Sequence, residues 1–158
     1  MLHCHVMTLW HVIWTFLLSM VPVGELRASL PVAMLTYDMH WYYALPIALV
    51  GNLLPVPFVL RFLDPLTRSV SKVRLFKRII DWVFARTRKR GKMVEKYGPI
   101  GLAIFVAVPL PGTGAWTGAI LAFLLGLDFK KSVLSIGLGV LAAGIIVTSL
   151  VLLGRLAV

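Results

Sequence analysis

The chain has 158 residues, of which 59% are hydrophobic and only 14% are charged, and its mean hydropathy is +0.92. Soluble domains average about 45 to 50% apolar and about 25% charged residues, so this composition excludes an ordinary soluble domain. At this length we expect a single integral membrane domain over residues 1–158. The formal net charge of +10 would suit nucleic acid, but no recognition motif accompanies the basic residues, and we expect no nucleic-acid partner.

The first half of the chain begins with two short apolar runs, residues 6–21 and 28–37, separated by a turn with Pro22 and Gly24. Neither run has the roughly 20 residues that a membrane-spanning helix needs. Three aromatic residues at 41–43 mark a membrane interface, and the apolar stretch that follows is long enough to span. The first repeat, residues 6–60, is therefore predicted to be a helical hairpin followed by a transmembrane helix.

A basic connector, residues 61–98, follows the first repeat. It contains twelve of the sixteen Lys and Arg residues and only three acidic ones, which indicates a cytoplasmic location under the positive-inside rule. Leu66, Val70 and Val73 recur at three- and four-residue spacings, so residues 65–96 are predicted to form an amphipathic helix on the membrane surface. Membrane lipids with anionic head groups are its expected partners.

The second repeat, residues 99–153, follows the same plan. Short apolar runs at 99–108 and 115–127 flank Pro109-Leu110-Pro111-Gly112-Thr113-Gly114, where a continuous helix is unfavourable. Residues 132–153 form a full-length apolar stretch rich in small residues, which let helices approach closely in lipid. At an offset of 88 residues the two halves align without a gap, and three pairs match: Gly24 with Gly112, Gly51 with Gly139 and Leu53 with Leu141.

The path of the second half follows from its charges. If residues 99–127 crossed the membrane once, Lys130 and Lys131 would lie outside, against the usual bias. We therefore predict a re-entrant hairpin that enters from the cytoplasm, and a first hairpin that enters from the other side. Irregular backbone at membrane depth survives only against protein or a watery cavity, so the turns are predicted to meet near the midplane. The expected fold is an all-α, multi-pass inner (plasma) membrane protein with two inverted repeats.

The first turn supplies two candidate substrate or ion-binding residues, Glu25 and Arg27. They would be the only formal charges at depth, where a charge costs about 2.5 to 3.5 kcal/mol or more and generally faces a cavity or a partner. Glu25 is a candidate for exchanging a proton or binding a cation, and Arg27 for neutralising it or gripping an anionic head group. The alternative is that the two only pair and tie down the turn.

The second turn supplies backbone and hydroxyl groups. A helix that begins near Gly112 to Thr117 points unpaired N–H groups outward and favours an anion, and Thr113 and Thr117 add hydroxyl ligands. The alternative for Gly114 is close packing, since it forms a Gly-x-x-x-Gly pair with Gly118. Asn52 is a further candidate within the first span, although bonding to a freed backbone carbonyl is the more ordinary use of such a residue.

Enzyme chemistry is not indicated. No nucleophile with a base, metal cluster or nucleotide loop is visible, so neither catalysis nor a cofactor is expected. The spacing of His3, Cys4, His5 and His11 matches none of the usual zinc patterns, and no metal is expected. Pro-Gly-Thr-Gly lacks the spacing and the Lys-Ser/Thr of a phosphate-binding loop.

Four segments resemble the small multi-drug export protein family of prokaryotes: Glu25 to Pro31 (ELRASLP), Gly51 to Pro55 (GNLLP), Lys96 to Gly98 (KYG) and Val108 to Gly118 (VPLPGTGAWTG). The resemblance covers roughly residues 12–153. The family is similar at a distance to the DedA superfamily, for which paired re-entrant loops, proton-coupled transport and lipid-carrier translocation have been proposed. The resemblance therefore implies a fold like the one predicted from the residues.

The leading functional prediction is a secondary transporter that moves a small or amphipathic substrate, with an anionic substrate and proton coupling through Glu25 as further hypotheses. A second hypothesis is a lipid or lipid-carrier flippase or scramblase, in which Arg27 and the amides of residues 112–117 receive a phosphate head group. A third is a non-transporting membrane scaffold that docks through residues 65–96. Because the two halves are short, a homodimer is a further expectation.

Overall fold

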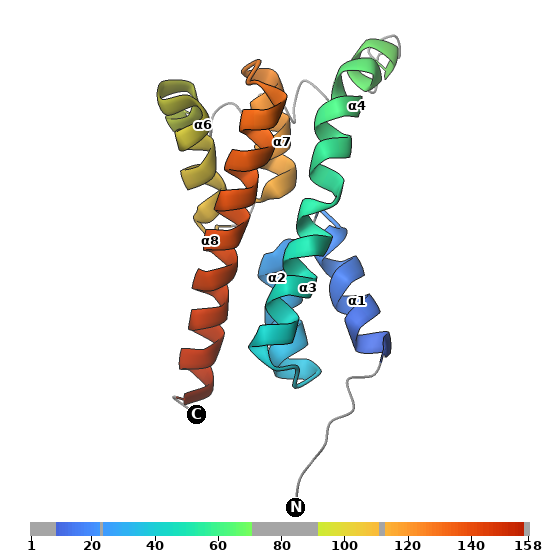
Figure 1. The fold of residues 1–158 in the computed structure, drawn as a ribbon, viewed down its shortest axis with the longest axis vertical. Coiled ribbons are helices and arrows are strands. Elements are labelled where there is room, and N and C mark those ends of the chain that lie inside the picture. The colour runs from blue at the N-terminus through green and yellow to red at the C-terminus, as the bar shows by residue number, and fades with distance from the viewer. Residues whose placement is uncertain (1–8, 23, 71–91, 111–112, 157–158) are drawn as a thin grey trace, which may run out of the picture.

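Two long helical paths run the length of the molecule (Figure 1). The computed structural model describes residues 9–22, 24–70, 92–110 and 113–156, and every regular element in these ranges is a helix. One path is α3 (Trp41–Leu53) continued by α4 (Pro55–Val70), and the other is α8 (Phe129–Leu156). Their apolar parts have 23 and 28 residues, or roughly 34 and 42 Å of helix, which is enough to cross a membrane.

Two pairs of shorter helices pack beside the long ones. The first pair is α1 (Leu9–Met20) and α2 (Glu25–Pro31), the latter continued by the π-helix η1 (Val32–Thr36). The second pair is α6 (Lys92–Ala107) and α7 (Ala115–Leu124). In Figure 1 the first pair occupies the lower half of the molecule and the second pair the upper half. The turn within each pair therefore faces the turn of the other near the middle.

The helix breaks lie close to the positions that Pro and Gly predict. α1 ends before Pro22, and α6 ends before Pro109. Two boundaries differ from the prediction. α2 begins at Glu25 instead of Ala28, so Arg27 lies in a helix and not in the turn. The helix of the first span does not end at Leu60. α4 continues to Val70, so the helix extends beyond the apolar stretch into a segment that contains charged residues.

Two glycines allow the shorter helices α1 and α6 to pack closely against the long helices α3 and α8, respectively. A Cβ atom on Gly51 of α3 would lie 2.6 Å from the carbonyl oxygen of Phe16 in α1. A Cβ atom on Gly139 of α8 would likewise lie 2.6 Å from the carbonyl oxygen of Ala103 in α6. Both distances are too short for any real side chain, so the paired helices touch through their backbones. Gly51 and Gly139 are one of the two glycine pairs that the 88-residue offset aligns.

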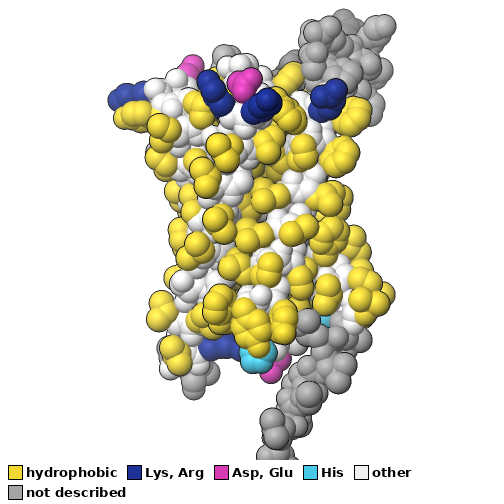
Figure 2. Space-filling view, in the orientation of Figure 1, with side chains coloured by type: hydrophobic (Ala, Val, Ile, Leu, Met, Phe, Trp, Pro, Cys, Tyr) yellow, Lys and Arg dark blue, Asp and Glu magenta, His cyan; other side chains and the backbone are white. Residues whose placement is uncertain are grey.

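The surface between the two ends of the molecule is apolar. Along α3 and α4, large exposed side chains recur every four residues, at Val50, Leu54, Phe58 and Phe62. Figure 2 shows a broad hydrophobic band, with charged side chains only near the two ends of the visible face. The core lies between the helices, and its largest fully buried side chains include Leu26, Leu30, Met34, Leu102, Leu121 and Ile136. Such an outer surface suits contact with lipid and not with water.

The prediction of an amphipathic helix over residues 65–96 falls largely on residues 71–91, which lie outside the described residues. The described parts at its two ends, the last turns of α4 and the first turns of α6, are helical. His3, Cys4 and His5 also lie outside the described residues, and His11 stacks on the ring of Tyr37 with centroids 4.5 Å apart.

Candidate functional site

Glu25 and Arg27 form an ion pair at the start of α2. Arg27 Nη1 donates a hydrogen bond to Glu25 Oε2 at 2.9 Å, and Glu25 is only 7% exposed. The φ angle of Glu25 is +48°, a left-handed conformation that a non-glycine residue adopts at a cost of about 1 to 3 kcal/mol when it is held by its surroundings. This strain persists because the contacts of Glu25 with the opposite turn fix its position.

Arg27 crosses to the opposite turn through its other terminal nitrogen. Its Nη2 lies 3.0 Å from the carbonyl oxygen of Val106, 2.9 Å from that of Val108 and 3.2 Å from Thr113 Oγ1. The carbonyls at a helix C-terminus have no partner within the helix and carry partial negative charge. The guanidinium therefore caps the C-terminal end of α6.

Thr113 holds together the turn between α6 and α7. Its Oγ1 lies 2.7 Å from the carbonyl oxygen of Val108 and 2.8 Å from that of Leu110, and it also accepts from Arg27. One hydroxyl has a single proton, so it donates to one of the two carbonyls at a time. The predicted hydroxyl ligand is thus engaged in holding its own turn and in receiving Arg27.

The Glu25 carboxylate lies at the N-terminal end of α7. The backbone N–H of Trp116 donates a hydrogen bond to it. Gly114, the residue before α7, makes room for this approach, because a Cβ atom there would lie only 1.4 Å from Glu25 Oε2. The first N–H groups of a helix lack partners and carry partial positive charge, which a carboxylate offsets.

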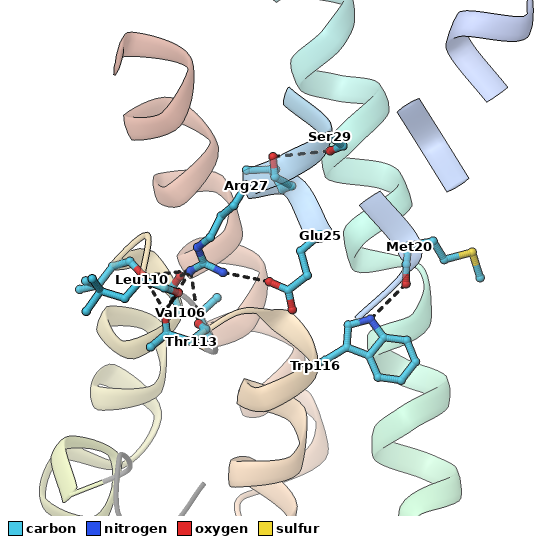
Figure 3. A network of polar contacts seen from close by, with 10 residues as sticks. Met20, Glu25, Arg27, Ser29, Val106, Leu110, Thr113 and Trp116 are labelled. Carbon is cyan, nitrogen blue, oxygen red and sulfur yellow. Dashed lines mark hydrogen bonds and ion pairs between the residues drawn. The ribbon is translucent and has the colours of Figure 1, made fainter. Parts of the chain in front are cut away.

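The two charges at the start of α2 therefore meet the two helix ends that flank the second turn, each with the favourable sign (Figure 3). Arg27 lies on the negative end of α6, and Glu25 lies on the positive end of α7. The sequence predicted that α7 would present an open N-terminus to an anion. In the structure the Glu25 carboxylate lies at that end, which agrees with a pair that ties the turn down. Binding of a substrate or ion by these residues stays a prediction.

Comparison with known proteins gives a family. Residues 25–146 match the small multi-drug export proteins. The chain belongs to this family. Searches of curated proteins and of solved structures find no match. The family and the apolar helices together make this a membrane protein of a transporter family. The relation to the DedA superfamily stays a prediction.

The family match begins at Glu25 and contains both charged residues of the network together with the second turn. One contact reaches outside the matched segment. The indole Nε1 of Trp116 donates to the carbonyl oxygen of Met20, the last residue of α1, at 3.1 Å. The sequence prediction named no partner for Trp116, although an indole N–H that is removed from water usually requires an acceptor.

Two predicted site residues of this multi-drug export family member, Asn52 and Thr117, make no hydrogen bond with the described residues of the network. Asn52 lies near the middle of the first span and is 3% exposed, and its Oδ1 has no hydrogen-bond partner. The expected bond to a freed carbonyl would be donated by Asn52 Nδ2, so it stays a prediction. Thr117 lies half-buried on the first turn of α7, and Gly112 lies outside the described residues.

Proposed function

We propose that this protein is a secondary transporter of the inner membrane that moves a small or amphipathic substrate bearing an anionic group, coupled to protons. Its substrate path lies at the midplane, between two re-entrant hairpins formed by α1–α2 and α6–α7. The observation that carries the proposal is the buried network in which Glu25 and Arg27 of one turn bind both helix ends of the other. Charges at that depth in a transporter usually mark the substrate or ion pathway.

The inverted repeat and its orientation have separate support. Gly51 and Gly139, equivalent in the two halves, make the same backbone contact between a long helix and the first arm of its hairpin. Arg61, Lys130 and Lys131 belong to the end at which α8 begins, and Asp38 and Arg155 to the opposite end. The positive-inside rule then assigns the lysine-bearing end to the cytoplasm.

The proposed coupling of substrate to protons follows from the two groups that the Glu25 carboxylate binds. Its carboxylate holds the guanidinium of Arg27 and the N-terminus of α7, the two groups best suited to an anionic substrate. Substrate and ionised Glu25 therefore compete for the same partners. Protonation of Glu25 weakens its hold on both groups, so a proton and an anion bind together and move in the same direction.

The same contacts hold the two turns together. Arg27 donates to the carbonyl oxygen of Val106 and Trp116 donates to that of Met20, so both bonds cross between the turns. Transport requires these contacts to open alternately toward each side while each hairpin stays packed on its own long helix. A rigid-body movement of one repeat against the other satisfies both conditions.

Reconstitution in liposomes tests the proposal. Three probes are offered under a proton gradient: a fluorescent organic anion, a fluorescent organic cation and a head-group-labelled phospholipid. We expect the parent to move the anion together with protons. Glu25→Gln should uncouple anion flux from protons, and Arg27→Gln should lower anion flux by about tenfold, because it removes a buried charged hydrogen-bond donor.

Asp128→Asn is the matched control, since Asp128 precedes α8 at the charged end of the molecule and lies outside the network. It should transport as the parent does. If inserted Glu25→Gln and Arg27→Gln proteins moved every probe at the parent rate, the midplane site would be rejected. Preferential movement of labelled phospholipid would favour a flippase, and an absence of any flux in the parent would favour a scaffold.

A further inference from the structure

A second feature, separate from the network at the turns, is a groove at the end of the molecule where α8 finishes. It lies between α2–η1 and the last turns of α8 and has a volume of about 730 Å³. Its lining is formed by Pro31, Leu35, Val147, Leu150, Val151, Gly154 and Arg155. Arg155 is the only charged residue among them, so the groove combines an apolar channel with one cation.

The groove is open along the apolar flank of the molecule. Leu35 and Leu150 are 57% and 59% exposed, whereas Val147 at its floor is 8% exposed. An aqueous ligand would not be expected on such an apolar flank, because nothing polar lines it except at the Arg155 end. A hydrocarbon chain arriving from the lipid is the matching occupant.

Arg155 is held in place but keeps hydrogen-bonding capacity. Its Nη2 donates to the carbonyl oxygen of Met34, at 2.6 Å, and to Asp38 Oδ1. Met34 lies near the C-terminal end of η1, where a cation is favourable. A guanidinium has five N–H donors, and these two contacts use one nitrogen, so Nε and Nη1 remain for an anion. The Arg155 side chain is 40% exposed.

We propose that this groove binds a zwitterionic phospholipid, with one acyl chain in the apolar channel and the phosphate on Arg155. The neighbouring carboxylate of Asp38 complements the ammonium group of a phosphatidylethanolamine head group. Arg155 and Asp38 thus present both signs of charge side by side. The site does not depend on the proposed transport, because no residue of the network at the turns lines the groove.

Gly154 provides a way to fill the groove without disturbing the fold. It lines the groove, and a Cβ atom built on it would meet no heavy atom within 4 Å. Gly137 lies on the same helix, also has open space around its Cβ position, and does not line the groove. Gly154→Leu and Gly137→Leu are therefore matched variants that change the same helix by the same side chain.

The test is native mass spectrometry of the full chain released from detergent micelles. Three lipids with identical acyl chains are added in turn: phosphatidylethanolamine, phosphatidylglycerol and diacylglycerol. The parent should retain phosphatidylethanolamine best, because phosphatidylglycerol lacks the ammonium group and diacylglycerol the phosphate. Gly154→Leu should lower retention about tenfold by displacing a few methylene groups from the groove, and Gly137→Leu should retain lipid as the parent does.

Arg155→Gln should lower retention of phosphatidylethanolamine about twofold to fivefold and leave diacylglycerol unchanged, as expected for a partly exposed ion pair. Arg155 also binds η1, so Arg155→Gln changes both the fold and the proposed lipid site. Gly154→Leu leaves the contacts of Arg155 in place and is therefore the deciding variant. Equal retention by Gly154→Leu and Gly137→Leu, or equal retention of the three lipids by the parent, would overturn the proposal. So would a change in the monomer–dimer ratio of Gly154→Leu without loss of lipid, because the occupant would then be a second copy.

Discussion

At Gly114 the backbone of the second turn lies close to the carboxylate of Glu25. A methyl group at this position would overlap the Glu25 carboxylate, whose Oε2 lies 1.4 Å from the Cβ position. The backbone of Gly114 is extended, with φ −81° and ψ −168°, so alanine adds no backbone strain there. We expect Gly114→Ala to displace Glu25 from α7 and to lower the free energy of unfolding by about 1 to 3 kcal/mol, measured by thermal unfolding in detergent.

Gly137→Ala is the control for this substitution. Gly137 is a helical glycine with open space around its Cβ position, and alanine there should stabilise α8 by about 0.5 to 1 kcal/mol. The two variants should therefore move the unfolding temperature in opposite directions. An unchanged or raised unfolding temperature for Gly114→Ala would mean that the close approach of Glu25 to α7 is wrong.

Thr113 allows the hydroxyl group to be separated from the shape of its side chain. Thr113→Val keeps the shape but removes the oxygen that lies near the carbonyls of Val108 and Leu110 and accepts from Arg27. Leaving buried groups without partners costs about 1 to 3 kcal/mol, and we expect that loss in the free energy of unfolding. Thr113→Ser keeps the hydroxyl and should lose less. Equal losses in the two variants would assign the effect to packing.

For single residues, the sequence was enough to select Glu25 and Arg27 as candidates, but it did not predict which groups they bind. Glu25 and Arg27 stood out because charged residues are rare in apolar stretches. Their partners are backbone groups, the carbonyls of Val106 and Val108 and the N–H of Trp116, and every residue has these groups. These backbone partners therefore cannot be predicted from residue type. They are identified only by the contact between the two turns in the structure.

Among the helices, α6 contains a sharp change of direction at Gly98. Its φ of 56° and ψ of −130° lie in a region that is essentially restricted to glycine, and a Cβ atom would meet nothing within 4 Å. Any effect of Gly98→Ala therefore comes from the backbone alone. We expect a loss of about 1 to 3 kcal/mol in the free energy of unfolding. An unchanged or raised free energy of unfolding, as expected for Gly137→Ala, would indicate that α6 straightens freely.

Element boundaries were predictable to the extent that Pro and Gly set them. Pro22 and Pro109 end helices because proline lacks an N–H group and disfavours helix in the residue before it. The π-helix η1 was not predictable. It follows Pro31 inside a continuous helix, and its wider turn places the N–H of Tyr37 3.2 Å from the carbonyl oxygen of Val32. Its C-terminal end is held by Arg155, which is distant in sequence.

For the whole molecule, the proposed topology makes a labelling prediction. In a Cys4→Ser background, Lys130→Cys should react with an impermeant thiol reagent only after the cells are opened, whereas Asp38→Cys should react in intact cells. Asp38 and Lys130 belong to opposite ends of the molecule, because α8 runs from the lysine end to Arg155, the partner of Asp38. Both positions are exposed enough to react.

Labelling of Lys130→Cys from outside intact cells would contradict the re-entrant hairpins, as would labelling of both positions from the same side. Opened cells serve as the positive control, since both cysteines should then react.

The predictions of an all-helical fold and of two long apolar helices are confirmed. They could be made because the length of an apolar stretch is read directly from the sequence. Orientation across a membrane depends on charges at both ends, and it stays a prediction until this measurement.

The separation between Arg27 and its partners has a consequence for biosynthesis. Val106 and Thr113 follow Arg27 by 79 and 86 residues. At about 5 to 20 residues per second, the ribosome needs roughly 4 to 17 seconds to reach them, and N-terminal segments fold first. Glu25, two residues away and 2.9 Å from Arg27, is the one partner already synthesised. We expect the local ion pair to neutralise the guanidinium during this interval, before the second half of the chain is inserted.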